Sequence, residues 1–204
     1  NILFSKLRAK FIFVSNNFRF GNKREGNVEQ LKKYEPLYKY KIIKPKPLTK
    51  NKKIVSSTFI RYLIENGKLN QANKFLNREW SIEGKVIKGR QLGKKIGFPT
   101  ANIDIKDYVI AKPGVYGVKV KIQKTKKYIK GIANLGYRPT FKQNKILLEV
   151  HLFNFSGNLY YKDLTVEFLK FIRKEKKFKN VNQLSAQIKK DLNIAKKTKW
   201  LNHK

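Results

Sequence analysis

The sequence predicts a mainly β protein, in which a closed antiparallel barrel of five or six strands and a C-terminal helix follow a shorter mixed segment. After residue 80, strand-like stretches succeed one another at short intervals, namely 81–88, 114–122, 127–135, 145–153 and 164–172. Within 181–200, Leu184, Ile188 and Leu192 recur at four-residue spacing. That spacing predicts an amphipathic helix that packs on the barrel.

One pair of these strands is predicted to form a hairpin. In 114–122, alternate residues from Tyr116 to Ile122 share one apolar face. The interval QKTKK (123–127) is short, so 114–122 and 127–135 are expected to pair antiparallel. Consecutive antiparallel pairs of this kind favour the barrel.

The opening of the chain mixes strands and helices. KFIFV (10–14) predicts a buried strand, and 37–44 alternates like another strand. Short helices are expected at 28–34, 56–67 and 69–76. The second of these helices has a capping serine at its start and a glycine at its end.

Composition bounds the class of protein. The 204 residues are 41% hydrophobic, which is a globular composition, and no apolar stretch is long enough to span a membrane. There is no cysteine, so disulfides, thiolate catalysis and cysteine-ligated metals are excluded, and a reducing cytoplasm is the expected location. There is also no methionine, so we expect that the sequence begins inside a longer protein.

The net charge of +35 has two explanations. A basic surface is typical of proteins that bind polyanions such as nucleic acids. Alternatively, Lys, Asn, Ile and Phe are abundant together, and all four have A/T-rich codons, so the charge can reflect genome composition. The lysines are spread along the whole chain rather than gathered in a tail.

A glycine-rich basic segment follows the first predicted barrel strand. In 84–103 it carries Gly89, Gly93 and Gly97, with Lys94 beside the second glycine. Glycines let backbone N–H groups approach an oxyanion closely, which is useful for binding phosphate. The spacing is not that of a Walker A loop, and an ordinary glycine-rich loop is an equally good interpretation.

PTAN (99–102) adds oxygen donors directly after these glycines. The Thr100 hydroxyl and the Asn102 side-chain carbonyl alternate along an extended chain, so they can point the same way. Hard oxygen ligands of this kind suit Mg²⁺ beside phosphate. The alternative is a turn in which both side chains bond to local backbone.

Glu149 is unusual because it lies inside an apolar strand. It shares a face with Leu147 and His151. A glutamate is expensive to bury without a partner, so it is either functional or turned outward among the lysines. His151 is interpreted as a structural group, because no companion ligands with metal spacing accompany it.

Several motifs together resemble a known family. GRQLGKKIGFPTAN, PGVYGV, GIANLGYRPTF, LEVHLFNFSGNLYYK and FIRKEKKF are similar, in order and spacing, to the bacterial riboflavin kinase domain over residues 80–195. FVSNNFRFGNKREGN (13–27) and SSTFIR (56–61) resemble the closing motifs of an FMN adenylyltransferase domain. The chain therefore resembles the bifunctional riboflavin kinase/FMN adenylyltransferase family, the bacterial FAD synthetases, with its N-terminus truncated.

The resemblance implies two domains. Residues 1–75 would be the C-terminal part of the adenylyltransferase, an incomplete α/β nucleotidyltransferase (Rossmann-like) piece, and 76–204 the kinase, a six-stranded antiparallel barrel with a C-terminal helix. The implied reaction transfers the γ-phosphate of ATP to the 5′-hydroxyl of riboflavin and gives FMN. The full-length protein would also adenylylate FMN to FAD. Mg²⁺ with ATP is the implied cofactor, and no tightly bound organic cofactor is expected.

The resemblance also assigns residues. Glu149 would be the catalytic base, and Thr100 and Asn102 would hold the metal. The nucleotide-binding set would be Gly89, Gly93, Lys94, Gly97, Thr100, Asn102 and Asn134. The flavin-binding set would be Arg138, Thr140, Arg173, Glu175 and Phe178. The phosphate motif of the adenylyltransferase would be Ser56, Ser57, Thr58 and Arg61.

The sequence also departs from the family. Ser15 and Asn17 stand where the family usually has Gly and Asp, and Lys94 replaces a usual Arg. A rival function of another class is a basic RNA-binding β-barrel, which the charge and the interleaved aromatic residues permit. That rival explains neither PTAN nor a glutamate within an apolar strand.

Overall fold

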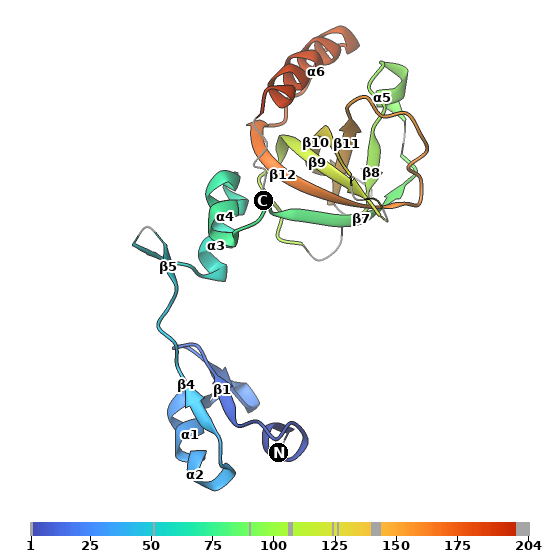
Figure 1. Ribbon diagram of the computed structural model, residues 1–204. Coiled ribbons are helices and arrows are strands. Elements are labelled where there is room, and N and C mark those ends of the chain that lie inside the picture. The colour runs from blue at the N-terminus through green and yellow to red at the C-terminus, as the bar shows by residue number, and fades with distance from the viewer. Residues whose placement is uncertain are drawn as a thin grey trace. The chain divides into compact units, whose positions relative to one another are not determined.

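The computed structural model describes residues 2–50, 52–89, 91–105, 108–123, 125, 127–139 and 144–198. Contacts divide the chain into two compact units, Asn1–Val55 and Ser56–Lys204. Their elements are labelled in Figure 1. Within the described ranges, no helix combines the length and the apolar character needed to cross a membrane.

The first unit is built around a parallel pair of strands, β1 (Phe11–Phe13) and β4 (Lys41–Ile43). The helices α1 (Val28–Lys33) and α2 (Glu35–Tyr38) lie between them in sequence, as a parallel crossover requires. Asn27 and Gln30 form a capping box at the start of α1. The smaller elements are η1 (Ile2–Lys6), β2 (Arg19–Phe20), η2 (Asn22–Arg24), β3 (Gly26–Asn27), β5 (Thr49–Lys50) and β6 (Lys53–Ile54).

Two predictions for this unit need correction. Residues 10–14 do contain a strand, but only one face is covered, since Val14 is buried whereas Phe11 and Phe13 are 59% and 68% exposed. Successive side chains of a strand point to opposite faces, and it is Ile12 that packs against the small core around Val28. Residues 37–44 are extended only at 41–43, because α2 occupies the preceding residues and has a proline in its first turn.

The second unit is a closed barrel of six antiparallel strands, which confirms the predicted fold class. The strand order around the barrel is β10–β11–β8–β7–β12–β9. The bounds are β7 (Ser81–Ile87), β8 (Ala101–Ile103), β9 (Gly114–Ile122), β10 (Tyr128–Pro139), β11 (Asn144–Leu152) and β12 (Asp163–Arg173). β9 and β10 form the predicted hairpin.

The barrel core follows the two-residue period of its strands. Tyr116, Val118 and Val120 on β9 are fully buried, as predicted. Phe168 on β12 packs on Tyr116 edge to face, with ring centroids 5.1 Å apart. The intervening residues of each strand therefore point outward, and some of them lie beneath a helix.

Two helices precede the barrel and pack with it. α3 (Ser57–Glu65) begins at Ser56, whose side chain accepts a hydrogen bond from the Phe59 N–H, and α4 (Leu69–Leu76) follows. Asn73 on α4 donates to the Phe168 carbonyl and accepts from the Trp80 N–H. Both predicted helices are confirmed. The predicted domain boundary after residue 75 rests on the family resemblance, whereas the compact units divide after residue 55. The boundary after residue 75 therefore stays a prediction.

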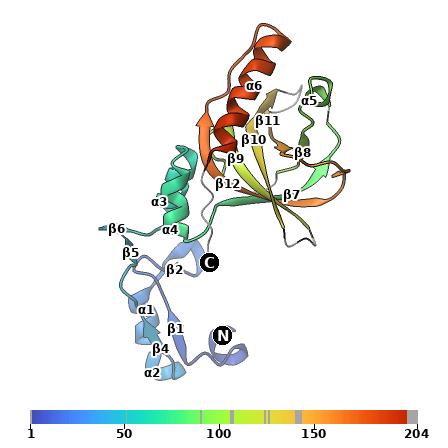
Figure 2. The same ribbon diagram turned by 45° about the horizontal axis from the view of Figure 1, so that its top comes forward.

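The C-terminal helix α6 (Val181–Lys196) covers part of the barrel's outside. Its buried Ala195 packs with Val115 and Ile132, two outward-pointing barrel residues. Figures 1 and 2 show α6 and the short helix α5 (Leu92–Lys95) facing each other across the same end of the barrel. Leu184 and Ile188, one part of the predicted apolar stripe, are only half-buried, because they line a pocket.

Candidate active site

The pocket lies on the outside of the barrel, beneath α6, and has a volume of about 430 Å³. Its floor comes from the outer face of β8 to β11, and its walls come from the α5 turn, the chain after β12, and α6. A volume of this size is typical of a site for a small molecule or cofactor. Successive side chains of a strand point to opposite faces, so the side chains that point away from the barrel core on these strands line the pocket.

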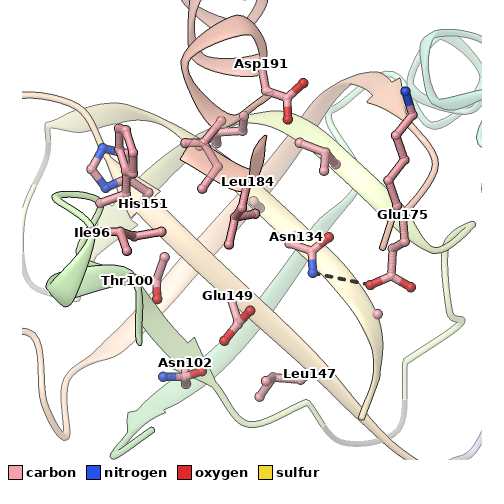
Figure 3. Close-up of a pocket in the computed structure, with 18 of the residues that line it drawn as sticks. Ile96, Thr100, Asn102, Asn134, Leu147, Glu149, His151, Glu175, Leu184 and Asp191 are labelled. Carbon is pink, nitrogen blue, oxygen red and sulfur yellow. Dashed lines mark hydrogen bonds between the residues drawn. The ribbon is translucent and has the colours of Figure 1, made fainter. Parts of the chain in front are cut away.

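A polar row crosses the floor of this pocket. Asn102 on β8 is the strand partner of Glu149 on β11, and Glu149 is the partner of Asn134 on β10. The same register runs on through the apolar Val115 on β9 to Arg173 on β12. All five residues line the pocket, and Figure 3 shows Glu149 between the two amides. Glu149 does point away from the barrel core, but into a covered pocket, where it is half-buried.

Glycines leave room for the polar side chains at one end of the row. A Cβ on Gly89 would overlap the Asn102 side-chain amide, which is only 6% exposed. A Cβ on Gly93 would overlap the Phe98 carbonyl and approach the Thr100 hydroxyl oxygen to 3.3 Å. Gly89 is therefore required sterically for Asn102 to lie where it does, and Gly93 is required for the backbone at Phe98, two residues before Thr100.

The oxygen donors beside Gly89 and Gly93 suit a hard cation that takes most of its ligands from water and phosphate. Thr100 and Asn102 offer a hydroxyl and an amide oxygen, and the Glu149 carboxylate is the next member of the row. Across the described ranges, no group of three or more His, Asp or Glu side chains is placed to hold a metal. Mg²⁺ is often bound by few protein oxygens, with water and phosphate completing its shell, so these residues fit that ion.

His151 has a structural contact at the edge of the pocket. Its Nδ1 lies 2.8 Å from the Pro99 carbonyl oxygen. A carbonyl oxygen only accepts, so Nδ1 carries the proton and donates. The bond ties β11 to the segment that leads into Thr100, which agrees with the structural role predicted for this histidine.

Apolar side chains also line the pocket. Ile96 and Phe98 come from the segment before β8, and Leu184 and Ile188 come from α6. Phe178, after β12, adds an aromatic ring. Apolar side chains and a polar row in one pocket are a suitable environment for a flat aromatic ring that carries a polar tail.

The chain after β12 is tied to the pocket at two points. Arg173 forms an ion pair with Asp191 on α6, with Nη2 and Oδ2 2.8 Å apart. The Asn134 side-chain amide donates to Glu175 Oε1 at 3.4 Å, the dashed line in Figure 3. Gly136 lies under the Glu175 carboxylate, and a Cβ there would overlap it.

The pocket brings together much of the set predicted from the sequence. The predicted residues that line it are Gly93, Thr100, Asn102, Asn134, Glu149, Arg173, Glu175 and Phe178. Gly89, Lys94 and Gly97 are not among the lining residues. Thr140 and the side chain of Arg138 lie outside the described residues. Ser56, Ser57, Thr58 and Arg61 lie at the start of α3 and do not line this pocket.

Sequence reasoning missed Asp191, which is 2% exposed and lines the pocket. The signal was present. Asp191 falls seven residues after Leu184 and three after Ile188, so it lies on the face that the apolar stripe defines. A carboxylate in an apolar stripe indicates a buried partner, which here is Arg173.

Two family models match different parts of this chain. The riboflavin kinase family model matches residues 76–199, which contain every residue of the pocket. The chain belongs to the riboflavin kinase family. The FAD synthetase family model matches residues 1–59, so both resemblances found in the sequence are confirmed.

Several similar proteins are described by both activities, riboflavin kinase and FMN adenylyltransferase. A protein of Buchnera aphidicola subsp. Schizaphis graminum, described as bifunctional riboflavin kinase/FMN adenylyltransferase, is 44% identical over 97% of this chain and 64% of its own length. A protein of Haemophilus influenzae with the same description is 40% identical over 95% of this chain and 63% of its own length. A solved structure from Streptococcus pneumoniae, described as a macrolide-efflux protein, is 30% identical with a TM-score of 0.82, over 97% of this chain and 64% of that one. The chain thus spans less than two thirds of these relatives.

Proposed function

We propose that the barrel unit is an ATP-dependent riboflavin kinase, which transfers the γ-phosphate of ATP to the 5′-hydroxyl of riboflavin and releases FMN and ADP. The observation that carries the proposal is the Asn102–Glu149–Asn134 row in a pocket that apolar side chains also line. The apolar side chains suit the isoalloxazine ring, and the row suits the ribityl hydroxyls and the phosphates. Membership of the riboflavin kinase family supports the same assignment.

Glu149 is the proposed catalytic base. The attacking oxygen is a primary hydroxyl, which loses its proton as the bond to phosphorus forms, and the Glu149 carboxylate accepts that proton. The bond from the γ-phosphorus to the bridging oxygen of ADP breaks, and the electron pair leaves with ADP. The amides of Asn102 and Asn134 flank Glu149 and orient the reacting groups by hydrogen bonds. The cover that α6 provides helps to exclude water from the pocket.

Thr100 and Asn102 are the proposed ligands for Mg²⁺ at the phosphate end. Their oxygens lie on the same outer face as Glu149, and Gly89 and Gly93 leave the space that these side chains occupy. Bound Mg²⁺ would neutralise charge on the transferring phosphates. Gly97 and Lys94 remain part of the proposed nucleotide site through the backbone and charge of the glycine-rich segment.

Phe178, Glu175 and Arg173 are proposed to cover the flavin, with Arg138 and Thr140 as further candidates. Phe178 lines the pocket together with Leu184 and Ile188 of α6, which supplies apolar surface for a ring. Glu175 already accepts a hydrogen bond from Asn134, a member of the polar row. The segment that follows β12 therefore has both apolar and polar groups for a ring with a hydroxylated tail.

The whole protein is proposed to adenylylate FMN to FAD as well, in the cytoplasm. The FAD synthetase match over residues 1–59 supports this assignment. Ser57, Thr58 and Arg61 are exposed at the start of α3, where they are available to a phosphate, whereas the Ser56 side chain caps the helix. The chain of 204 residues is expected to form FMN without converting it to FAD.

The test is direct product analysis. The full chain is incubated with riboflavin and Mg-ATP, and the flavins and nucleotides are separated by chromatography. FMN and ADP in equal amounts, dependent on added Mg²⁺, are expected, with no FAD. No FMN from folded protein would contradict the proposal. An RNA-binding barrel would instead show binding to RNA that weakens steeply with salt, and no turnover.

A further inference from the structure

A buried ion pair joins α6 to the end of the last barrel strand. The Asp191 side chain is 2% exposed. Its two carboxylate oxygens accept hydrogen bonds from Arg173 Nε at 3.1 and 2.9 Å, and Arg173 Nη2 lies 2.8 Å from Oδ2. Gln187, one turn earlier on α6, donates to Asp191 Oδ1 at 2.8 Å. Both oxygens of the carboxylate are therefore held.

Arg173 is placed where the chain leaves the barrel. It is the last residue of β12, and Glu175 and Phe178, which are also proposed to cover the flavin, lie two and five residues after it. Besides Asp191, its guanidinium donates from Nη1 to the Lys174 carbonyl at 2.9 Å and lies 5.8 Å from the centre of the Phe178 ring. One side chain thus contacts α6, the first residue after the strand, and the aromatic ring that lines the pocket.

The geometry of this pair explains why an aspartate occupies the apolar stripe. A guanidinium is a rigid planar donor, and paired bonds to a carboxylate fix its orientation as well as its position. Two apolar side chains could give similar stability at such a place, because burying charges carries a large desolvation cost. They would not fix the direction in which the following segment runs.

We infer that Asp191 is a positioning residue for the flavin site, which holds Arg173 so that Glu175 and Phe178 lie over the pocket before substrate binds. Asp191 acts through Arg173 and is not a catalytic residue. The identity of the ligand as riboflavin rests on the proposed function above. A segment that is ordered in advance loses less conformational freedom when the ligand binds, so affinity for the flavin should depend on Asp191.

The matched control is a partly buried carboxylate that pairs with a cation, on the strand that carries Arg173. Glu167 on β12 lies 2.9 Å from Lys119 Nζ through Oε2, and its side chain is 15% exposed. Neither Glu167 nor Lys119 lines the pocket. Asp191→Asn and Glu167→Gln each remove one negative charge that pairs with a cation, so an effect that comes only from losing an ion pair should appear in both variants.

The experiment compares steady-state kinetics and riboflavin binding of the full chain and both variants at a temperature where all are folded. Asp191→Asn is expected to raise KM and Kd for riboflavin by about tenfold, with KM for Mg-ATP changed by less than about twofold. Glu167→Gln should leave both KM values within about twofold. Equal riboflavin affinity in Asp191→Asn and the parent, or an equal rise in both variants, would overturn the positioning role.

A second measurement does not depend on the reaction. Trypsin cleavage after Lys174, Lys176 and Lys177, followed by mass spectrometry without ligand, should be about fivefold faster in Asp191→Asn than in the parent or in Glu167→Gln. An unchanged rate would overturn the inference. If cleavage accelerates while the parent makes no FMN, the positioning role holds and the proposed function fails.

Discussion

Asn134 on β10 lies directly opposite Glu149 on β11, and Asn102 on β8 lies opposite Glu149 on its other side. The three side chains come from three different strands, and the register of the barrel places them in a row. Because adjacent strands are fixed by backbone hydrogen bonds, this row is rigid and does not require a loop to close before its members meet. The site therefore follows from the barrel's register.

The hydroxyl of Thr100 is expected to set the requirement for Mg²⁺. Thr100→Ala should raise the Mg²⁺ concentration needed for half-maximal activity by about tenfold or more, since changes even to outer-shell metal partners commonly cost 10–100-fold. Thr100→Ser is the matched control, because it keeps the oxygen and should keep the requirement within about threefold of the parent. Titration of FMN formation against Mg²⁺ measures both. Identical curves for the alanine variant and the parent would remove Thr100 from the metal site.

Gly89 is expected to act through the space it leaves for Asn102. Gly89→Ala should displace the Asn102 amide and reduce kcat/KM for Mg-ATP about as much as Asn102→Ala, roughly tenfold or more. Gly117→Ala is the control, because a Cβ there would meet its nearest atoms at 3.7 and 3.9 Å, an ordinary packing distance. Equal activity of the two glycine variants would show that the space beside Asn102 is not needed.

Tyr128 is expected to make stability fall between pH 10 and 12. Its hydroxyl donates to Glu167 Oε1 at 2.8 Å, and that bond, with burial adding to it, raises the pKa of Tyr128 from 10.0 to about 12. The unfolded chain therefore loses this proton at lower pH than the folded protein does. The stabilisation is fully present below pH 10 and is lost as pH rises through about 12.

The measurement is tyrosinate absorbance, taken as the difference between the parent and Tyr128→Phe. The difference should have a midpoint near pH 12, and Glu167→Gln should lower that midpoint toward 10.0. Urea unfolding of Tyr128→Phe should show a smaller loss of stability over this pH range than the parent does. A parent midpoint near 10.0 would contradict the role of the Tyr128–Glu167 bond.

The barrel was predictable because its signal is local. Alternation along β9 identified Tyr116 and Val118 as core residues, and both are fully buried. β8 was not singled out, because three residues are too few to show a period. Exposure of Phe11 and Phe13 was not predictable either, since apolar character alone does not say which face of a strand is covered.

The candidate site was predictable only in part. Periodicity placed Glu149 with Leu147 and His151 on one face, but whether that face is covered depends on α6, which lies about forty residues later in sequence. Asp191 was missed because its partner Arg173 comes from a different element, and their pairing depends on how α6 packs. The resemblance to the riboflavin kinases, and not a local pattern, led to Arg173, Glu175 and Phe178.

The central claim is that this barrel makes FMN with Glu149 as the base, and FMN formation by Glu149→Gln tests it most directly. The variant keeps the size and hydrogen-bonding capacity of the side chain but loses its basicity, so kcat should fall by about 10²-fold or more, with nucleotide binding nearly unchanged. Glu175→Gln is the comparison, since Glu175 also lines the pocket, and kcat there should fall by less than about tenfold. If Glu149→Gln turns over riboflavin within about threefold of the parent, which is too little loss for a general base, the assignment of Glu149 is wrong.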